Sequence, residues 1–126
     1  MDFEISLSDG YALVSLRGAF SNQDTLELQP RINRFCVEHN VWKVLVDVTG
    51  VQGEITVLRR YQVGAGLAQA ANRNTRVAIL ATRAQKLDDA FFESVVRNRG
   101  LEWRIFVDRA EALGWLIGGV STSMQF

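Results

Sequence analysis

The hydrophobic pattern of this chain is densest at residues 43–51, where β-branched and aliphatic side chains follow one another. A run that is apolar on both faces predicts a strand in the middle of a sheet that helices cover. The polar residues Gln52, Gly53 and Glu54 come next and predict a turn from that strand into a helix. Open α/β sheets usually place their functional surface at such carboxyl ends. We therefore expect the candidate site at the end of this strand.

Alternating apolar and polar residues predict two strands ahead of the central one. Phe3, Ile5 and Leu7 alternate with polar residues, and a second alternating stretch covers residues 11–17. The dipeptide Asp9-Gly10 lies between them, and Asp-Gly is a strong signal for a tight hairpin turn. The two strands should therefore form an antiparallel hairpin.

Apolar residues at helical spacing predict about four helices. The first should follow a capping box at Ser21 and end at Asn40, with a kink or a restart at Pro30. The last should follow a capping residue at Asp108. The predicted helices cover residues 22–39, 56–72, 85–98 and 110–117.

Two more buried strands are predicted at residues 76–81 and 103–107. The order of elements is then ββαβαβαβα. It predicts an α/β fold with a mixed sheet of about five strands, in which an antiparallel hairpin is followed by parallel βα units. Residues 1–117 should form one domain, and residues 118–126 should be a flexible tail.

Composition narrows the functional classes. The chain has 126 residues, of which 48% are hydrophobic and 22% charged, as in an ordinary globular domain. Its formal net charge is zero, so no bulk charge attracts nucleic acid. The single cysteine, Cys36, excludes an internal disulfide. No stretch reaches the ~18 uninterrupted apolar residues of a spanning helix, and the acidic N-terminus does not resemble a secretion signal. We therefore expect a cytoplasmic protein.

Few residues are placed for catalysis. Cys36 and His39 lie three residues apart on the predicted first helix, but Cys36 falls on its apolar side, so a structural cysteine is the favoured interpretation. Asp47, at the end of the central strand, is either a catalytic base or an acceptor for turn amides, and we favour the turn role. Asp47 and Glu54 alone do not complete a metal site. No catalytic residue, metal or cofactor is predicted.

Five short stretches occur in an order and at a spacing that resemble a known family. They are residues 28–32 (LQPRI), 44–50 (VLVDVTG), 76–80 (RVAIL), 104–108 (RIFVD) and 111–116 (EALGWL). Together with the order of elements, they resemble STAS domains, and among these the SpoIIAA-like group of small bacterial proteins, whose fold is related to CRAL-TRIO lipid-binding domains. The resemblance implies a STAS-like fold and a regulatory protein, similar to anti-sigma-factor antagonists, that acts by binding other proteins.

The resemblance also bears on one regulatory site. In phosphorylated members of the family, the strand that is similar to residues 44–48 ends in Asp-Leu-Ser-Gly, and a turn with a phosphorylated serine follows. Here the first motif stands as Asp47-Val48-Thr49-Gly50, and the second falls on Ile55-Thr56-Val57-Leu58, without its acid and glycine. Thr56 is either a helix cap or a candidate phosphorylation site, and we favour the cap.

The leading hypothesis is a non-enzymatic binding or regulatory module that acts through protein–protein contacts with an unknown partner. Its predicted binding surface comprises Asp47, Thr49, Gly50, Gly53, Glu54, Thr56, Arg59 and Arg60. An exposed first strand also favours a homodimer. The alternative, from a different class, is a carrier of a small apolar, lipid-like ligand in a cavity between the sheet and the helix that contains residues 91–96.

Overall fold

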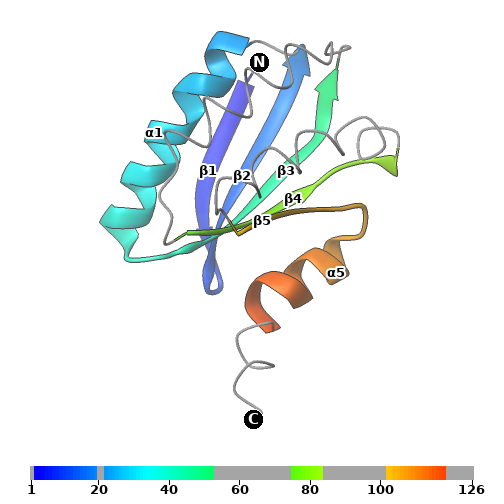
Figure 1. Cartoon of the computed structure of the whole chain (residues 1–126). Coiled ribbons are helices and arrows are strands. Elements are labelled where there is room, and N and C mark those ends of the chain that lie inside the picture. Colours follow the sequence, from blue (N-terminus) through cyan, green and yellow to red (C-terminus); the bar gives the residue numbers. More distant parts are fainter. Residues whose placement is uncertain (1, 20–21, 53–74, 84–101, 119–126) are drawn as a thin grey trace.

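The computed structural model describes residues 2–19, 22–52, 75–83 and 102–118, which contain one five-stranded sheet with helices packed against it (Figure 1). The elements are β1 (Asp2–Ser8), β2 (Tyr11–Ala19), α1 (Asn22–His39), β3 (Lys43–Gln52), β4 (Arg76–Leu80), β5 (Trp103–Phe106), α5 (Arg109–Leu113) and a π-helical turn (Gly114–Gly118). The strands lie side by side in sequence order. β1 is antiparallel to β2, and β2 to β5 are parallel, which confirms the predicted mixed sheet.

Two of the predicted helices fall within this part of the chain. The helix expected over residues 22–39 is α1, and the helix expected after Asp108 begins as α5. The helices expected over residues 56–72 and 85–98, the capping residue Ser21 and nearly all of the predicted tail lie outside the described residues.

The turn between β1 and β2 sets the register of the hairpin. Ser8 pairs with Tyr11 across the two predicted turn residues. The second of them, Gly10, has φ +85°, a conformation that residues with side chains rarely adopt. From this closure the pairing runs to the far end of β1 and brings Glu4 opposite Ser15, so polar residues of both strands share one face.

α1 packs on the sheet by a narrow apolar stripe. Leu28, Ile32 and Cys36 repeat every four residues, and all three are buried against the strands. The helix continues through Pro30, so the predicted restart is wrong. The packing of residues on both sides of the proline holds the helix together despite the lost amide.

The C-terminus of α1 lies at Asn40, as predicted. Asn40 has φ +51°, and its amide donates to the Val37 carbonyl at 3.3 Å. The amide of Val41 donates to the Cys36 carbonyl at 3.0 Å. These two bonds form a Schellman motif, which satisfies carbonyl groups at the end of the helix and turns the chain into β3.

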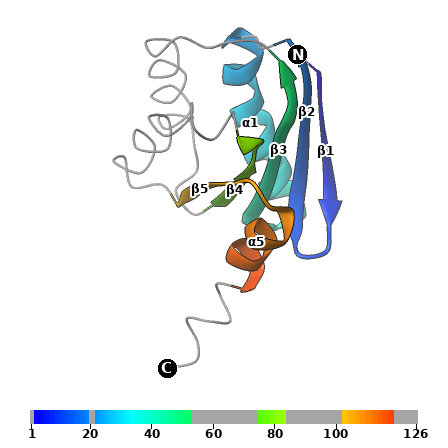
Figure 2. The same ribbon diagram turned by 90° about the vertical axis from the view of Figure 1, so that its right-hand side faces the viewer.

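The two faces of the sheet carry two separate cores, because neighbouring residues of a strand point to opposite sides. On the face under α1 the strands contribute Ala12, Val14, Leu16, Val44, Val46, Val77, Ile79, Trp103 and Ile105. On the other face Tyr11, Leu45, Ala78 and Leu80 pack against Ala112 of α5 and Leu116 of the π-helical turn. Figure 2 shows that α5 lies near one end of the strands. Among the described residues, those that form the second core therefore lie toward that end of the sheet.

Arg76 connects β4 to the π-helical turn. Its Nη1 donates to the Trp115 carbonyl at 2.9 Å, and its guanidinium carbon lies 4.6 Å from the centre of the Trp115 ring. Its Nε and Nη2 donate to Glu102 Oε2 at 3.1 and 2.8 Å. One arginine therefore joins β4, the residue before β5 and the C-terminal turn.

α5 begins at the predicted capping residue but is shorter than the predicted helix. Asp108 accepts a hydrogen bond from the Glu111 amide at 3.0 Å. The α-helical residues end at Leu113, and the chain continues as the π-helical turn instead of an α-helix to residue 117. Ala112 and Leu116 are both fully buried, so the wider turn still keeps the predicted apolar side on the sheet.

Candidate functional site

β3 has one residue more than β2 where the two strands approach their carboxyl ends. Ser15 pairs with Asp47 and Arg17 pairs with Gly50, so two steps along β2 match three steps along β3. An extra residue of this kind is a β-bulge, which bends the strand and changes the direction of its side chains.

The bulge keeps the strand apolar toward α1. Val48 and Val51 are an odd number of residues apart, yet both pack against the core under α1. In a regular strand, residues three apart point to opposite faces. The strand predicted over residues 43–51 is therefore present, because β3 continues to Gln52, and Asp47 lies inside the strand at the bulge and not at its end.

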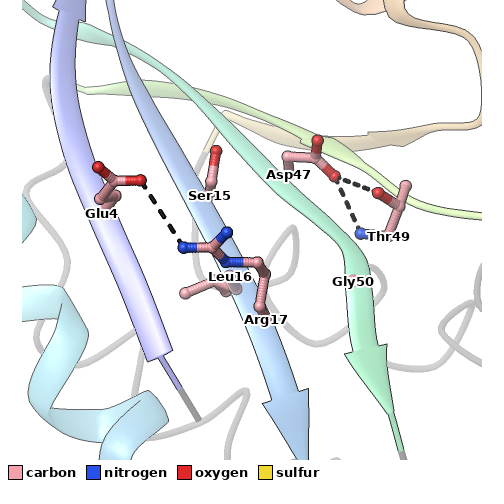
Figure 3. Close-up of a pocket in the computed structure, with 7 residues that line it drawn as sticks. All are labelled: Glu4, Ser15, Leu16, Arg17, Asp47, Thr49 and Gly50. Carbon is pink, nitrogen blue, oxygen red and sulfur yellow. Dashed lines mark hydrogen bonds and ion pairs between the residues drawn. The ribbon is translucent and has the colours of Figure 1, made fainter.

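Asp47 holds the bulge together. Its Oδ1 accepts a hydrogen bond from the Thr49 amide at 2.9 Å and another from Thr49 Oγ1 at 2.6 Å (Figure 3). A carboxylate that binds the amide two residues ahead is a common turn device. The structural role that the sequence predicted for Asp47 is therefore present.

Asp47 also connects β3 to α5. Its Oδ2 lies 3.6 Å from Arg109 Nη2, and the side chains are 21% and 49% exposed. A pair that is this open to water contributes at most about 1 kcal/mol to stability. Its main effect is to fix the orientation of the carboxylate between α5 and the bulge.

Gly50 is required by the close approach of β2. A Cβ atom at this position would lie 3.0 Å from the Leu16 carbonyl oxygen and 3.1 Å from Arg17 Cγ. The first of these is backbone, which has little freedom to move away. The absence of a side chain at Gly50 therefore lets the bulged strand stay paired with β2.

An open hollow of about 320 Å³ lies beside the bulge, on the face opposite α1. Figure 3 shows Glu4 projecting from β1, Ser15 and Arg17 from β2, and Asp47 and Thr49 from β3. The full lining is Glu4, Ser15, Leu16, Arg17, Asp47, Thr49 and Gly50.

The charged groups of the hollow are of both signs. Arg17 Nη2 lies 3.8 Å from Glu4 Oε2, and these side chains are 68% and 79% exposed. Water screens such a pair strongly. Glu4 and Arg17 therefore remain accessible to a binding partner, whereas Asp47 is mostly covered and held by Thr49 and Arg109.

The structure brings together part of the predicted binding surface. Asp47, Thr49 and Gly50 line the hollow. The other predicted residues, which include the candidate phosphorylation site, lie outside the described residues: Gly53, Glu54, Thr56, Arg59 and Arg60. Sequence reasoning missed Glu4, Ser15 and Arg17, although the hairpin register was a usable signal for them.

Cys36 and His39 serve different parts of the molecule. Cys36 is fully buried in the core under α1, and burial raises the pKa of its thiol, which keeps it protonated and a poor nucleophile. His39 is exposed and stacks on Phe35, with ring centres 4.0 Å apart, and its Nδ1 lies 3.0 Å from the Phe35 carbonyl oxygen. Cys36 is therefore a structural residue, as predicted.

The described ranges contain neither a metal-binding cluster nor a membrane-spanning helix. Among those residues, no three His, Cys, Asp or Glu side chains are grouped so that they could hold a metal ion. Nor does that part of the chain contain a helix with the length and hydrophobicity that crossing a bilayer requires.

Comparison with solved structures identifies the fold. No protein-family model matches the chain, and no curated protein is significantly similar to it. The structure is similar to the crystal structure of an anti-sigma factor antagonist from Mycobacterium paratuberculosis, with a TM-score of 0.64 and 13% sequence identity over 91% of this chain and 92% of that chain. The chain therefore shares the fold of that anti-sigma factor antagonist, which agrees with the fold predicted from its sequence.

Proposed function

We propose that the protein is a non-enzymatic, cytoplasmic regulatory module that binds another protein through the hollow beside the β3 bulge. The observation that carries this proposal is the hollow itself, where three strands expose charged and hydroxyl side chains on one face of the sheet. It lies toward the carboxyl ends of β2 and β3, the side of an open α/β sheet on which ligands usually bind. The fold, shared with an anti-sigma factor antagonist, supports a role in regulation.

The lining of the hollow favours a protein partner over a small apolar ligand. Pockets for small molecules are mostly lined by hydrophobic and aromatic side chains. Here the side chains of Glu4, Arg17 and Asp47 supply charge, and those of Ser15 and Thr49 supply hydroxyl groups. Such groups fit a polar protein surface of complementary charge, which also guides association.

The structural neighbour suggests which class of partner to test first. An anti-sigma factor antagonist acts, by its name, on an anti-sigma factor. We therefore place a protein of that class first among candidate partners. Phosphorylation at Thr56 stays a prediction, which mass spectrometry of the protein from its own cells would test.

The test uses one variant in the hollow and one matched control. Arg17→Glu reverses an exposed charge in the hollow, and Arg104→Glu reverses an exposed charge on β5. Proteins retained by the immobilised wild type are identified by mass spectrometry, and binding is then measured by calorimetry with purified components. We expect Arg17→Glu to weaken binding by at least about tenfold, a difference of about 1.4 kcal/mol, and Arg104→Glu to leave it unchanged. Equal affinity for both variants, or no partner for the wild type, would overturn the proposal.

The carrier hypothesis makes a different forecast. The carrier would hold its ligand in a cavity between the sheet and the helix that contains residues 91–96. These residues lie outside the described part of the chain. Native mass spectrometry of the purified protein decides between the two. A bound lipid-like mass would favour the carrier, whereas the mass of the bare chain supports the protein-binding module.

A further inference from the structure

We propose that two copies of this chain associate through β1, so that their sheets join as one continuous sheet about a two-fold axis at Ile5. This inference does not rest on the proposed function, although Glu4 of β1 also lines the hollow. It rests on the state of the sheet edge, on the pattern of β1 and on the charges of α1.

The two edges of the sheet differ in how well they are protected against pairing. Proteins protect edge strands by making them short, by bulges, by proline and by charged side chains, above all lysine. β5 is four residues long and carries the exposed Arg104. β1 is seven residues long, contains neither proline nor lysine, and pairs with β2 without a register shift; its charges are the acidic residues Asp2 and Glu4 in its first half. Within the described part of the chain, no strand pairs with its outer side.

The hairpin turn determines which backbone groups of β1 point outward. Residues that close a two-residue turn form a hydrogen-bonded pair, and such pairs alternate along an antiparallel ladder. Ser8 and Tyr11 close the turn, so the even-numbered residues of β1 direct their amides and carbonyls to β2. The amides and carbonyls of Phe3, Ile5 and Leu7 then point away from the sheet, where a second β1 can bind them.

The side chains of β1 are self-complementary in this arrangement. With Ile5 on the two-fold axis, Phe3 of one copy lies opposite Leu7 of the other, which covers a leucine that is 55% exposed in the single chain. The acidic residues oppose serines, Asp2 with Ser8 and Glu4 with Ser6, so no carboxylate faces another.

Charges on α1 match the same two-fold axis. The guanidinium carbon of Arg31 lies 5.3 Å from the centre of the Phe3 ring, so this side of α1 lies along the β1 edge. α1 runs in the direction of β1 (Figure 1). Because Phe3 of the second copy lies opposite Leu7 of the first, Arg31 of the second copy lies at the level of Leu7 of the first. That level is about 13 Å beyond Phe3 of the first copy along the strand. Glu38 of the first copy lies seven residues after its own Arg31, which is about 10 Å along the helix in the same direction. In this arrangement Arg31 of one copy and Glu38 of the other therefore lie at about the same level along the strands, where their opposite charges attract each other.

A cysteine cross-link tests the register directly. Ile5→Cys places two cysteines on the two-fold axis, where paired Cα atoms lie about 5.5 Å apart, within the disulfide range. Leu7→Cys is the matched control, because the two Leu7 positions lie about 13 Å apart in this register although Leu7 is the more exposed residue. The native Cys36 is buried and stays in both variants.

Under mild oxidation we expect Ile5→Cys to form a covalent dimer and Leu7→Cys to remain at least about tenfold less cross-linked, as expected from the disulfide geometry. Sedimentation of the wild type at about 100 μM should give the mass of a dimer, since specific dimers of this kind fall in the micromolar range or tighter. A monomer at that concentration, or equal cross-linking of both variants, overturns the proposal.

A charge reversal gives a second test that does not depend on β1. Arg31→Glu or Glu38→Arg alone places like charges opposite each other and should weaken the dimer at least about fivefold. The double variant restores opposite charges and should recover most of the affinity. If the double variant dimerises as weakly as the single variants, the two α1 helices do not lie opposite each other, and the two-fold at Ile5 is rejected.

Discussion

The two faces of the sheet differ in polarity, and the difference develops along β3. Toward α1, β3 presents Val44, Val46 and Val48, and all of them pack against the core. Toward the other face the same strand presents the fully buried Leu45 and then Asp47, which lines the hollow. β2 changes in the same way, from apolar residues at its start to polar residues at its end. Each strand therefore supports a closed core with one set of side chains and an open polar surface with the other.

This difference separates folding from binding at the level of single positions. Because side chains alternate with period two, neighbouring residues of β2 and β3 serve different purposes. Substitutions on the α1 face should act on the free energy of unfolding. Substitutions around the hollow should act on a partner and change stability little, except where they disturb the bulge.

The largest effect is expected inside the α1 core. Ile32→Ala removes a buried side chain and leaves a cavity, so the free energy of unfolding should fall by about 2–4 kcal/mol. Urea denaturation followed by circular dichroism measures the loss. Val37→Ala on the exposed side of the same helix is the control and should stay within about 0.5 kcal/mol. A loss below about 1 kcal/mol for Ile32→Ala would contradict a close-packed core under α1.

The next largest effect is expected at Gly50, in the bulge of β3. Gly50→Ala places a Cβ against the backbone of β2 and should cost about 1–3 kcal/mol of stability. Gly114→Ala is the matched control, because the backbone of Gly114 has right-handed helical φ and ψ angles and nothing lies within 4 Å of an added Cβ. The control should be neutral or more stable by up to about 1 kcal/mol. Thermal unfolding of both variants distinguishes them, and equal stability would count against the close approach of β2 and β3.

A smaller effect is expected at the carboxylate of the bulge. Asp47→Ala removes the acceptor of two hydrogen bonds and should lower stability by about 1–2 kcal/mol. Asp47→Asn keeps an oxygen that accepts from the Thr49 amide, and it should recover at least half of that loss. Chemical denaturation of the two variants gives the comparison. If asparagine is as damaging as alanine, the amide bond is not what stabilises the bulge.

The smallest effect on stability is expected at the rim of the hollow. Arg17→Ala breaks an ion pair whose side chains are mostly exposed, so stability should change by less than about 0.5 kcal/mol. The same change should weaken the partner interaction. A variant that loses more than about 1 kcal/mol would show that Arg17 supports the fold, and the separation of the two faces would then fail at this position.

Local signals predicted most of the described fold. The Asp-Gly turn fixed the hairpin, the spacing of Leu28, Ile32 and Cys36 gave the buried side of α1, and Asn40 gave its end. Each of these features depends on residues that are close in sequence, so the pattern contains the information. At Pro30 the sequence left a kink or a restart open, and only the restart is wrong, because packing of the helix against the sheet outweighs the local cost of proline.

The candidate site was predicted less completely, because it depends on contacts between distant residues. Asp47 was recognised from its place at the end of a strand, but its ion pair with Arg109 spans two elements that no local pattern connects. The sequence contains one local indication of the bulge: Val48 and Val51 are both apolar although they lie three residues apart, a spacing that would place them on opposite faces of a regular strand. Glu4 and Arg17 lie on different strands, and only the pairing of those strands places them in one hollow.

The bulge in β3 has a consequence for how this chain tolerates changes in length. Deleting Thr49 would restore the ordinary ladder with β2 and would leave Val48 and Val51 two positions apart, so both would still face the core. The same deletion would remove both hydrogen bonds that Asp47 Oδ1 accepts, and it would change the lining of the hollow. Loss of this one residue should therefore alter the polar surface and leave the core under α1 closed. Among related sequences, a chain one residue shorter between Asp47 and Val51 is compatible with the same core.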